Sequence, residues 1–151
     1  MLNATNIFIL FFGLSFVLGL LVALIQSKAL ARALTSLYAL IHIAFTLFCW
    51  MHRGETVLDY FTFDTLGLLL QSVLSILTVT TVYHGFIYVR NDPPRIYAIY
   101  HAALIALIAA MTGAYLANGM TTVWIFVEAT TLAVSALIYH DRTAMALEAT
   151  W

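Results

Sequence analysis

Five apolar runs, each about as long as a bilayer is thick, dominate this sequence. A helix that crosses the hydrocarbon core needs roughly 20 apolar residues. Of the 151 residues, 64% are hydrophobic and 9% are charged, whereas soluble domains average roughly 25% charged residues. We therefore predict an all-α, polytopic membrane protein with a single membrane domain over residues 1–151. The expected transmembrane helices cover about residues 7–26, 34–51, 66–89, 96–117 and 121–139.

Polar segments and turn signals separate these runs. Residues 90–95 contain two prolines, which cannot continue a helix, and Asn118 followed by Gly119 favours a tight turn. Residues 55–63 are too short and too polar to span, so we expect an extended segment at the membrane interface. Its aromatic side chains are expected at the headgroup level: Tyr60, Phe61 and Phe63. Residues 141–151 are predicted to form an interfacial helix.

The basic residues are distributed unevenly between the two ends of the predicted helices. The loops after the first and third runs, together with the C-terminal tail, carry five of the six Lys and Arg residues. Because cytoplasmic loops are enriched in these residues, we expect the N-terminus outside and the C-terminus in the cytoplasm. We accordingly expect a multi-pass protein of the inner (plasma) membrane. No positive charge precedes the first run, which argues for a retained helix and against a cleaved signal peptide.

Charge and cysteine content exclude several classes of function. The formal net charge of -1 offers no basic field for nucleic acid. A single cysteine, Cys49, excludes an intramolecular disulfide and a multi-cysteine metal site. The sequence has no glycine-rich phosphate loop and no grouping of catalytic or metal-ligating residues. We therefore expect no catalytic chemistry, cofactor or metal on this chain, and leave open that it is a subunit of an ion-translocating oxidoreductase.

One carboxylate, Glu128, falls near the middle of the fifth run. A charge at the centre of a bilayer costs roughly 2.5–3.5 kcal/mol even on the lowest scales, unless the group is protonated or faces a basic partner or water. Thr121, Trp124, Thr131 and Ser135 recur with Glu128 at steps of three and four, so they share one face. Such a polar stripe faces other helices or water. We therefore expect Glu128, Thr131 and Ser135 to belong to a proton or ion path, the alternative being a neutral, buried glutamate.

Histidines are the second group of candidates, because their side chains titrate near neutrality and can carry protons. His42 lies in the middle of the second run, and we place it in the path with Glu128. His84, His101 and Asp64 are expected to be structural or relay residues near the ends of runs, and Asp64 is also a candidate helix cap. Polar residues are expected on the same helix faces: Tyr38, Thr46 and Cys49 with His42, and Gln71, Ser75 and Thr78 in the third run.

Six short phrases in the sequence follow one another in a distinctive order. They are FDTLGLLL (63–70), YHGFIY (83–88), RIYAIY (95–100), ANGM (117–120), WIFVEATTL (124–132) and RTAMALEATW (142–151). This order resembles the N-terminal part of the antiporter-like ion-translocating subunits of respiratory complex I, Mrp-type sodium/proton antiporters and membrane-bound group 4 hydrogenases. The phrase around Glu128 and the C-terminal phrase are most similar to the hydrogenase-4 and formate-hydrogenlyase-like branch.

The resemblance implies roles for two residues. In that family, a glutamate of the fifth helix is a key residue of the proton channel and pairs with a lysine on the seventh helix, and Glu128 matches that glutamate. Asp64 matches an acidic residue at the start of the family's third helix. The family's subunits have about fourteen helices, including two inverted five-helix repeats. No residue here matches the lysine, because the only lysine, Lys28, falls in a predicted loop.

We therefore expect a split or truncated antiporter-like subunit that contributes to proton or sodium translocation in a complex-I-like or hydrogenase-like respiratory assembly. The expected partners are the lipid bilayer and other membrane subunits, including a chain that supplies the lysine-bearing helices. The main alternative is a structural membrane-anchor subunit without an ion path. A membrane subunit that binds haem through histidines on two helices is a weaker alternative, since the histidines form no obvious pair at one depth.

Overall fold

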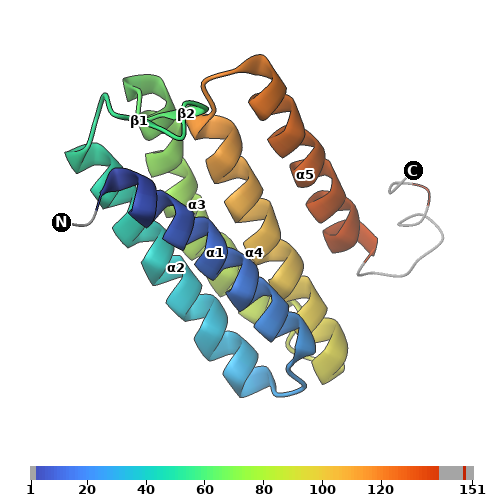
Figure 1. Ribbon diagram of the computed structural model, residues 1–151. Coiled ribbons are helices and arrows are strands. Elements are labelled where there is room, and N and C mark those ends of the chain that lie inside the picture. Colours follow the sequence, from blue (N-terminus) through green and yellow to red (C-terminus); the bar gives the residue numbers. More distant parts are fainter. Residues whose placement is uncertain (1–2, 140–147, 149–151) are drawn as a thin grey trace.

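The computed structural model describes residues 3–139 and residue 148. These residues form five helices and one short β-hairpin (Figure 1). The elements are α1 (Ala4–Leu24), α2 (Lys28–Met51), β1 (Thr56–Val57), β2 (Phe61–Thr62), α3 (Thr65–Tyr88), α4 (Pro94–Leu116) and α5 (Met120–Ile138). All five helices are long and apolar enough to cross a membrane, which confirms the predicted all-α fold and its number of candidate spans. The interfacial helix predicted at 141–151 lies outside the described residues, except for residue 148.

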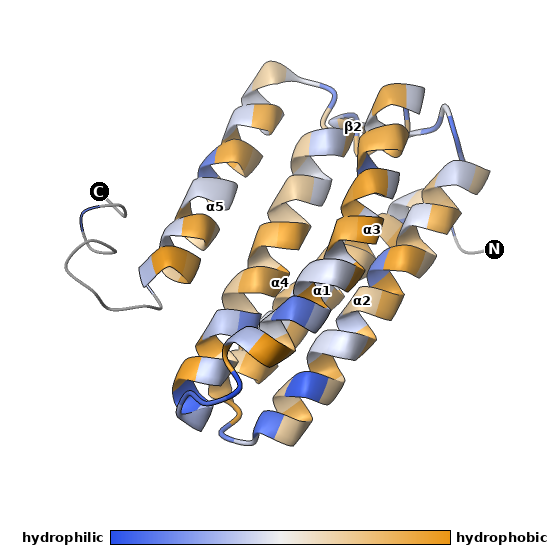
Figure 2. Cartoon of the chain, turned by 180° about the vertical axis from the view of Figure 1, so that it is seen from behind, coloured by the Kyte–Doolittle hydropathy of each residue, from blue (hydrophilic) through white to orange (hydrophobic). Residues whose placement is uncertain are grey.

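Helices α1 to α4 form an up-and-down bundle, and α5 lies at its edge (Figure 1). Short connections between consecutive helices favour antiparallel neighbours. Helix α4 packs against α1, α2, α3 and α5, whereas α5 packs almost entirely on α4. In both views α2 and α5 lie on opposite sides of the molecule (Figures 1 and 2). This position leaves one long side of α5 uncovered by the described part of the chain.

The bundle buries polar side chains and exposes large apolar ones. His42, Gln71 and Thr112 are fully buried, whereas Phe16 and Ile76 are 73% and 69% exposed. Hydrophilic residues are also frequent in the loops and at the helix ends (Figure 2). Lipid tolerates apolar side chains on the outside, while polar groups there are costly and turn toward the bundle interior. The pattern of exposure therefore supports a bundle that lies in a membrane.

Helix α2 begins at Lys28, six residues before its predicted start at residue 34. The prediction placed Lys28 and Arg32 in a loop because charged residues are costly in a membrane. Both lie in the first turns of α2, because long basic side chains can reach from a helix end to the interface. The Lys28 ammonium donates a hydrogen bond to the carbonyl oxygen of Arg90 (2.9 Å), just beyond the end of α3. The other four helices begin and end within three residues of their predicted bounds.

Residues 55–63 form the hairpin, in which β1 and β2 pair antiparallel. Tyr60 at its tip is exposed, as expected of a residue at the headgroup level, but Phe61 and Phe63 are buried. The predicted interfacial segment therefore packs two of its three aromatic rings against the chain, and its level in the membrane stays a prediction. Successive side chains of a strand point to opposite faces, and Phe61 turns toward the helices, where its ring centroid lies 4.6 Å from that of Phe8. The hairpin thus covers one end of the bundle.

Candidate functional site

Glu128 lies on α5 together with polar residues that were predicted to share its face. The indole Nε1 of Trp124 donates a hydrogen bond to Glu128 Oε1 (3.3 Å). The hydroxyl of Thr131 donates to the backbone carbonyl of Glu128 (2.8 Å) and lies 3.5 Å from Oε2. Trp124, Glu128 and Thr131 are exposed, and Ser135 is half-buried. The polar stripe therefore exists, and donors one turn before and after Glu128 orient its carboxylate.

The stripe faces away from the α1–α4 bundle, so the helices or water that it is expected to face do not belong to the described part of the chain. The opposite side of α5 packs on α4, where the ring of Phe126 covers Gly113 and Ala133 is buried. A Cβ atom on Gly113 would collide with the Phe126 ring, so glycine permits this close approach. Periodicity shows which residues share a face, but not which face meets a neighbour. The fit of Phe126 over Gly113 decides that orientation here.

Glu128 forms no ion pair within the described residues. The basic side chains of that part of the chain all lie near the two ends of the bundle: Lys28, Arg32, Arg53, Arg90 and Arg95. Glu128 is eight residues beyond the start of α5, which corresponds to about 12 Å along the helix. An exposed carboxylate at that depth faces lipid unless water or a further helix covers it. The site on α5 is therefore incomplete within the described residues.

Five polar side chains from α2, α3 and α4 meet inside the bundle. We name them the His42 cluster: His42, Thr46, Gln71, Ser75 and Thr112, all of which are buried. His42 Nε2 lies 3.0 Å from Gln71 Nε2 and 3.1 Å from Thr112 Oγ1. On the other side of the ring, Nδ1 lies 3.2 Å from Ser75 Oγ, which in turn is 2.8 Å from Thr46 Oγ1. Both ring nitrogens of His42 thus contact polar side chains of other helices.

The sequence pattern identifies four members of the His42 cluster and misses the fifth. Thr46 shares the face of His42, and Gln71 and Ser75 share a face of α3, as predicted. Thr112 is missed because the surrounding sequence of α4 is apolar or small and shows no polar periodicity. The packing of α4 against α2 brings Thr112 to a histidine 70 positions away in the sequence. That contact belongs to tertiary structure and leaves no local signal.

The predicted path of Glu128, His42, Thr131 and Ser135 separates into two groups. His42 lies nine residues before the end of α2, and Glu128 lies eight residues after the start of α5. Both are therefore about 12–14 Å from the hairpin end of their helices. However, α2 and α5 lie on opposite sides of the molecule (Figures 1 and 2), and no hydrogen bond among the described residues joins Glu128 to His42. The two residues share a depth but not a site.

The other two histidines among the candidates have different surroundings. His101 is fully buried, its Nδ1 lies 2.9 Å from the carbonyl oxygen of Tyr97, and its ring stacks against those of Tyr97 and Phe86. His101 Nε2 has no hydrogen-bond partner within the described residues. His84 is exposed, and its ring stacks against Tyr88. In that same part of the chain, no group of three His, Cys, Asp or Glu side chains could hold a metal ion.

Asp64 caps α3, as predicted. Its carboxylate accepts hydrogen bonds from the backbone N–H groups of Gly67 and the preceding residue, both at 3.2 Å. Beside it, a pocket of about 400 Å³ lies between the start of α3 and the end of α4. Gly67 and Tyr115 line this pocket. Gly67 lies one helical turn before Gln71 on the same face of α3, and Tyr115 lies one turn after Thr112 on the same face of α4. The pocket therefore lies one turn away from the His42 cluster, toward the hairpin end.

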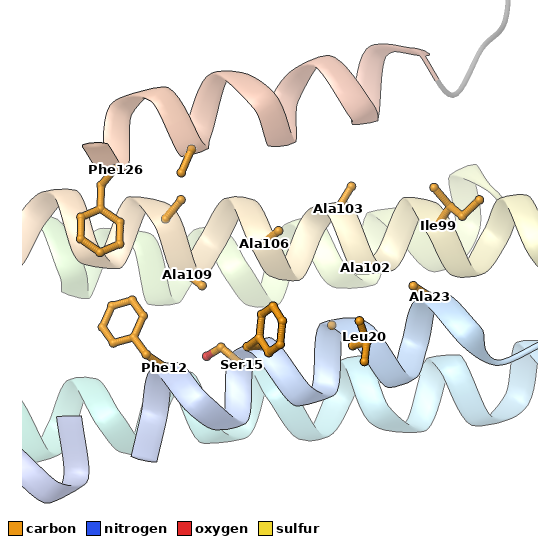
Figure 3. Close-up of a pocket in the computed structure, with 14 residues that line it drawn as sticks. Phe12, Ser15, Leu20, Ala23, Ile99, Ala102, Ala103, Ala106, Ala109 and Phe126 are labelled. Carbon is orange, nitrogen blue, oxygen red and sulfur yellow. The ribbon is translucent and has the colours of Figure 1, made fainter. Parts of the chain in front are cut away.

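A groove of about 540 Å³ lies between α1, α4 and α5 (Figure 3). Its lining is apolar and rich in small residues, including Ala23, Ala106 and Ala129. The polar side chain in this lining, Ser15, already donates its hydroxyl proton to the carbonyl oxygen of Phe11 (2.7 Å). The groove therefore offers no group for chemistry. Small residues of this kind allow close approach of another helix within a membrane.

Comparison with family models, curated proteins and solved structures finds no match to this chain. Its function is therefore argued from the two groups of polar residues. The carboxylate of Glu128 can bind a proton or a cation at the outer side of α5. The imidazole of His42 can bind a proton inside the bundle.

Proposed function

We propose that the chain is a membrane subunit of a complex-I-like or hydrogenase-like respiratory assembly, and that it contributes to proton or sodium translocation through Glu128. The observation that carries this proposal is an ionisable carboxylate at membrane depth, oriented by Trp124 and Thr131. An ionisable residue within a membrane is costly, so its presence points to function. The resemblance of residues 124–132 to the antiporter-like subunits supports the same role.

A further helix with a basic residue completes the proposed path. The uncovered stripe of α5 presents hydrogen-bonding groups around Glu128, and hydrogen bonds and close packing are what associate helices in lipid. A lysine on that helix would provide the counter-charge that allows Glu128 to ionise away from water. We infer that a neighbouring membrane subunit, or further helices joined to this chain, supplies it. The chain then acts as one part of a split antiporter-like unit.

The two ends of the bundle differ in charge, which supports an orientation in the membrane. One end carries four basic side chains and one acidic one within the described residues: Lys28, Arg32, Arg90, Arg95 and Asp92. The hairpin end carries three acidic side chains and one basic one: Glu55, Asp59, Asp64 and Arg53. We propose that the basic end faces the cytoplasm and that the membrane is the inner (plasma) membrane. The N-terminal end of α1 then lies outside.

A structural membrane-anchor subunit is the second candidate function. The observation that favours it is that the hydrogen bonds to the Glu128 carboxylate within the described residues come from its own helix, from Trp124 and Thr131. A neutral carboxyl group could accept the same bonds and would need no counter-charge. In that case Glu128 would help to hold a neighbouring helix without moving an ion.

Replacing Glu128 with glutamine in the assembled complex separates the two functions. Glutamine keeps the shape and the carbonyl acceptor but cannot bind or release a proton. If Glu128 carries the ion path, we expect the rate of proton or sodium uptake into proteoliposomes to fall by about a hundredfold or more, the scale of losing a proton-transferring group. The amount of intact complex, measured by native gel electrophoresis, should not change.

The matched control is Thr130→Val on the same helix. Thr130 is also near the middle of α5, and its hydroxyl donates only to the carbonyl oxygen of Val127 (2.7 Å). We expect this variant to transport at the normal rate. Unchanged transport by an intact Glu128→Gln complex would reject the ion path and leave the anchor function.

A further inference from the structure

The His42 cluster contains one buried polar atom that lacks a partner. Gln71 Oε1 makes no hydrogen bond within the described residues, whereas Nε2 of the same amide lies within 3.4 Å of three other polar atoms. A buried carbonyl oxygen without a donor destabilises a fold. Such atoms are rare in native proteins and call for an explanation. The unpartnered oxygen is therefore an acceptor within the cluster that a further donor could use.

The hydrogen bonds of the cluster place the ring proton of neutral His42 on Nδ1. The amide nitrogen of Gln71 can only donate, so His42 Nε2, 3.0 Å away, accepts from it. The other ring nitrogen then carries the proton and donates to Ser75 Oγ (3.2 Å). The hydroxyls of Thr46 and Thr112 donate to carbonyl oxygens of their own helices (3.0 and 2.9 Å). Their oxygen atoms are therefore available to accept.

A second proton on His42 would find acceptors without any movement of the backbone. The new N–H group at Nε2 faces Thr112 Oγ1 at 3.1 Å, and that oxygen is free to accept. Rotation of the Gln71 amide by half a turn would place Oε1, the unpartnered oxygen, where the nitrogen now contacts His42. The same side chains can therefore surround either the neutral or the protonated ring. That property belongs to a site that binds and releases a proton.

None of the groups that face His42 carries a positive charge that would repel a protonated His42 ring. They are Phe11 from α1, Tyr38 and Thr46 from α2, Gln71 and Ser75 from α3, and Thr112 from α4. Within this set Tyr38 is the other titratable side chain, and none of the set is charged near neutral pH. The Phe11 ring centroid lies 6.0 Å from that of His42, close enough for an aromatic ring to stabilise a cation.

A partly polar pocket lies between the cluster and the hairpin end. The pocket beside Asp64 has a polar rim that includes Asn118 and Thr62. Its floor at Gly67 and Tyr115 lies one helical turn from the cluster, which is about 5 Å along a helix axis. The two helices touch at this floor, because a Cβ atom on Gly67 would collide with the carbonyl oxygen of Tyr115. Small movements of α3 against α4 there would admit water to the cluster.

From this arrangement we propose that the His42 cluster is a proton-binding site inside the α1–α4 bundle, separate from Glu128. A hydronium ion that enters from the hairpin end transfers one proton to His42 Nε2 and leaves as water, and the bond to Thr112 and the rotated Gln71 amide hold the imidazolium. The site goes beyond the proposed function, because it needs neither Glu128 nor a partner subunit.

Nitrogen NMR of the histidine rings tests this site directly. The full chain, labelled with ¹⁵N-histidine, is placed in lipid nanodiscs and titrated from roughly pH 8 to pH 3, which includes and extends below the range in which histidines ordinarily change charge. The His42→Gln variant identifies the His42 signals by their loss. We expect His42 to be neutral with its proton on Nδ1 at the upper end and to become doubly protonated as the pH falls. A His42 ring that stays neutral throughout would overturn the proposal.

Two variants separate a proton site from a structural cluster. Thr112→Val removes an acceptor of the new N–H group, and we expect it to weaken proton binding about tenfold, which lowers the midpoint of the titration by about one pH unit. Thr78→Val is the matched control, because Thr78 is buried in α3 and its hydroxyl donates only to the carbonyl oxygen of Leu74 (2.8 Å). It should leave the midpoint unchanged. Equal midpoints in the Thr112→Val chain and the normal chain would show that Thr112 does not hold the protonated ring. That result would contradict the proposed proton site.

The titration and the transport assay can fail independently. A Glu128→Gln chain should titrate at His42 like the normal chain, since α2 and α5 lie on opposite sides of the molecule (Figure 1) and no hydrogen bond among the described residues joins the two side chains. Loss of the His42 titration in the Glu128→Gln chain would contradict a separate site, even if the transport result supported the proposed function.

Discussion

Glu128 and His42 lie at the same depth in the bundle, but their side chains are accommodated in opposite ways. Two other helices, α3 and α4, contribute the groups that hydrogen-bond the His42 ring. The bonds to Glu128 within the described residues come from α5 itself. A polar group in lipid must be paired; His42 is paired within this chain, whereas Glu128 is exposed and bonded only within its own helix among the described residues. Substitutions at His42 should therefore affect the stability of the chain itself, whereas substitutions at the exposed Glu128 should leave that stability close to normal.

The Asp64 cap allows a quantitative prediction at the scale of one residue. Replacing Asp64 with alanine should lower the free energy of unfolding by about 1 kcal/mol, because two N–H groups at the start of α3 lose their acceptor. Reversible denaturation in detergent measures this loss. Asp64→Asn retains an equally good capping group and should remain close to normal. A loss in the asparagine variant as large as in the alanine variant would show that charge, and not the cap, is what matters.

At the scale of secondary structure, the docking of α5 on α4 decides where Glu128 points. Helix α5 exposes its polar stripe because Phe126 packs over Gly113 on the opposite side. A rotation of α5 about its axis that buried Glu128 would expose Phe126 and leave an empty space over Gly113. The position of the candidate ion-binding carboxylate therefore depends on a contact between a phenylalanine and a glycine that play no part in ion chemistry.

Replacing Gly113 with alanine tests this docking. The added methyl group would collide with the Phe126 ring, and overpacking of this kind costs about 1–3 kcal/mol. We expect thermal unfolding in detergent at a correspondingly lower temperature. Adding Phe126→Leu should recover part of the loss, because neighbouring substitutions are not additive.

The matched control for that experiment is Gly13→Ala on α1. A Cβ atom on Gly13 would have no other atom within 4 Å. Alanine is favoured over glycine within a helix by about 1 kcal/mol, so this variant should be at least as stable as the normal chain. If both alanine variants behaved alike, the close contact between Phe126 and Gly113 would not hold α5 in place.

At the scale of the whole molecule, the bundle combines an apolar exterior with two polar groups at membrane depth. The His42 cluster lies within α1 to α4 and is buried, whereas the stripe on α5 lies at the edge and is mostly exposed. This division predicts that the α1–α4 bundle forms without partners and that α5 carries the surface for further helices. The asymmetry of charge between the two ends of the bundle defines how it is expected to lie in the membrane.

Labelling of single cysteines tests that orientation. In a Cys49→Ala background, Asn118→Cys places a thiol at the hairpin end and Gln26→Cys places one at the basic end, and both positions are exposed. We expect a membrane-impermeant maleimide to label residue 118 in intact cells, and residue 26 only after the membrane is permeabilised. The reverse pattern would mean that the positive-inside rule does not govern this chain.

The sequence by itself determined the number of helices, nearly all of their bounds and the residues that share each helix face, because length, hydropathy and periodicity are local properties. The cap at Asp64 was likewise predictable, since its partners are its neighbours in the chain. Only the tertiary structure decided that α5 turns Glu128 outward, that Phe61 of the hairpin is buried against the helices, and that Thr112 contacts His42. Each of these depends on contacts between residues far apart in sequence. Such contacts require side chains whose shapes fit one another, and that fit produces no periodic pattern in the sequence.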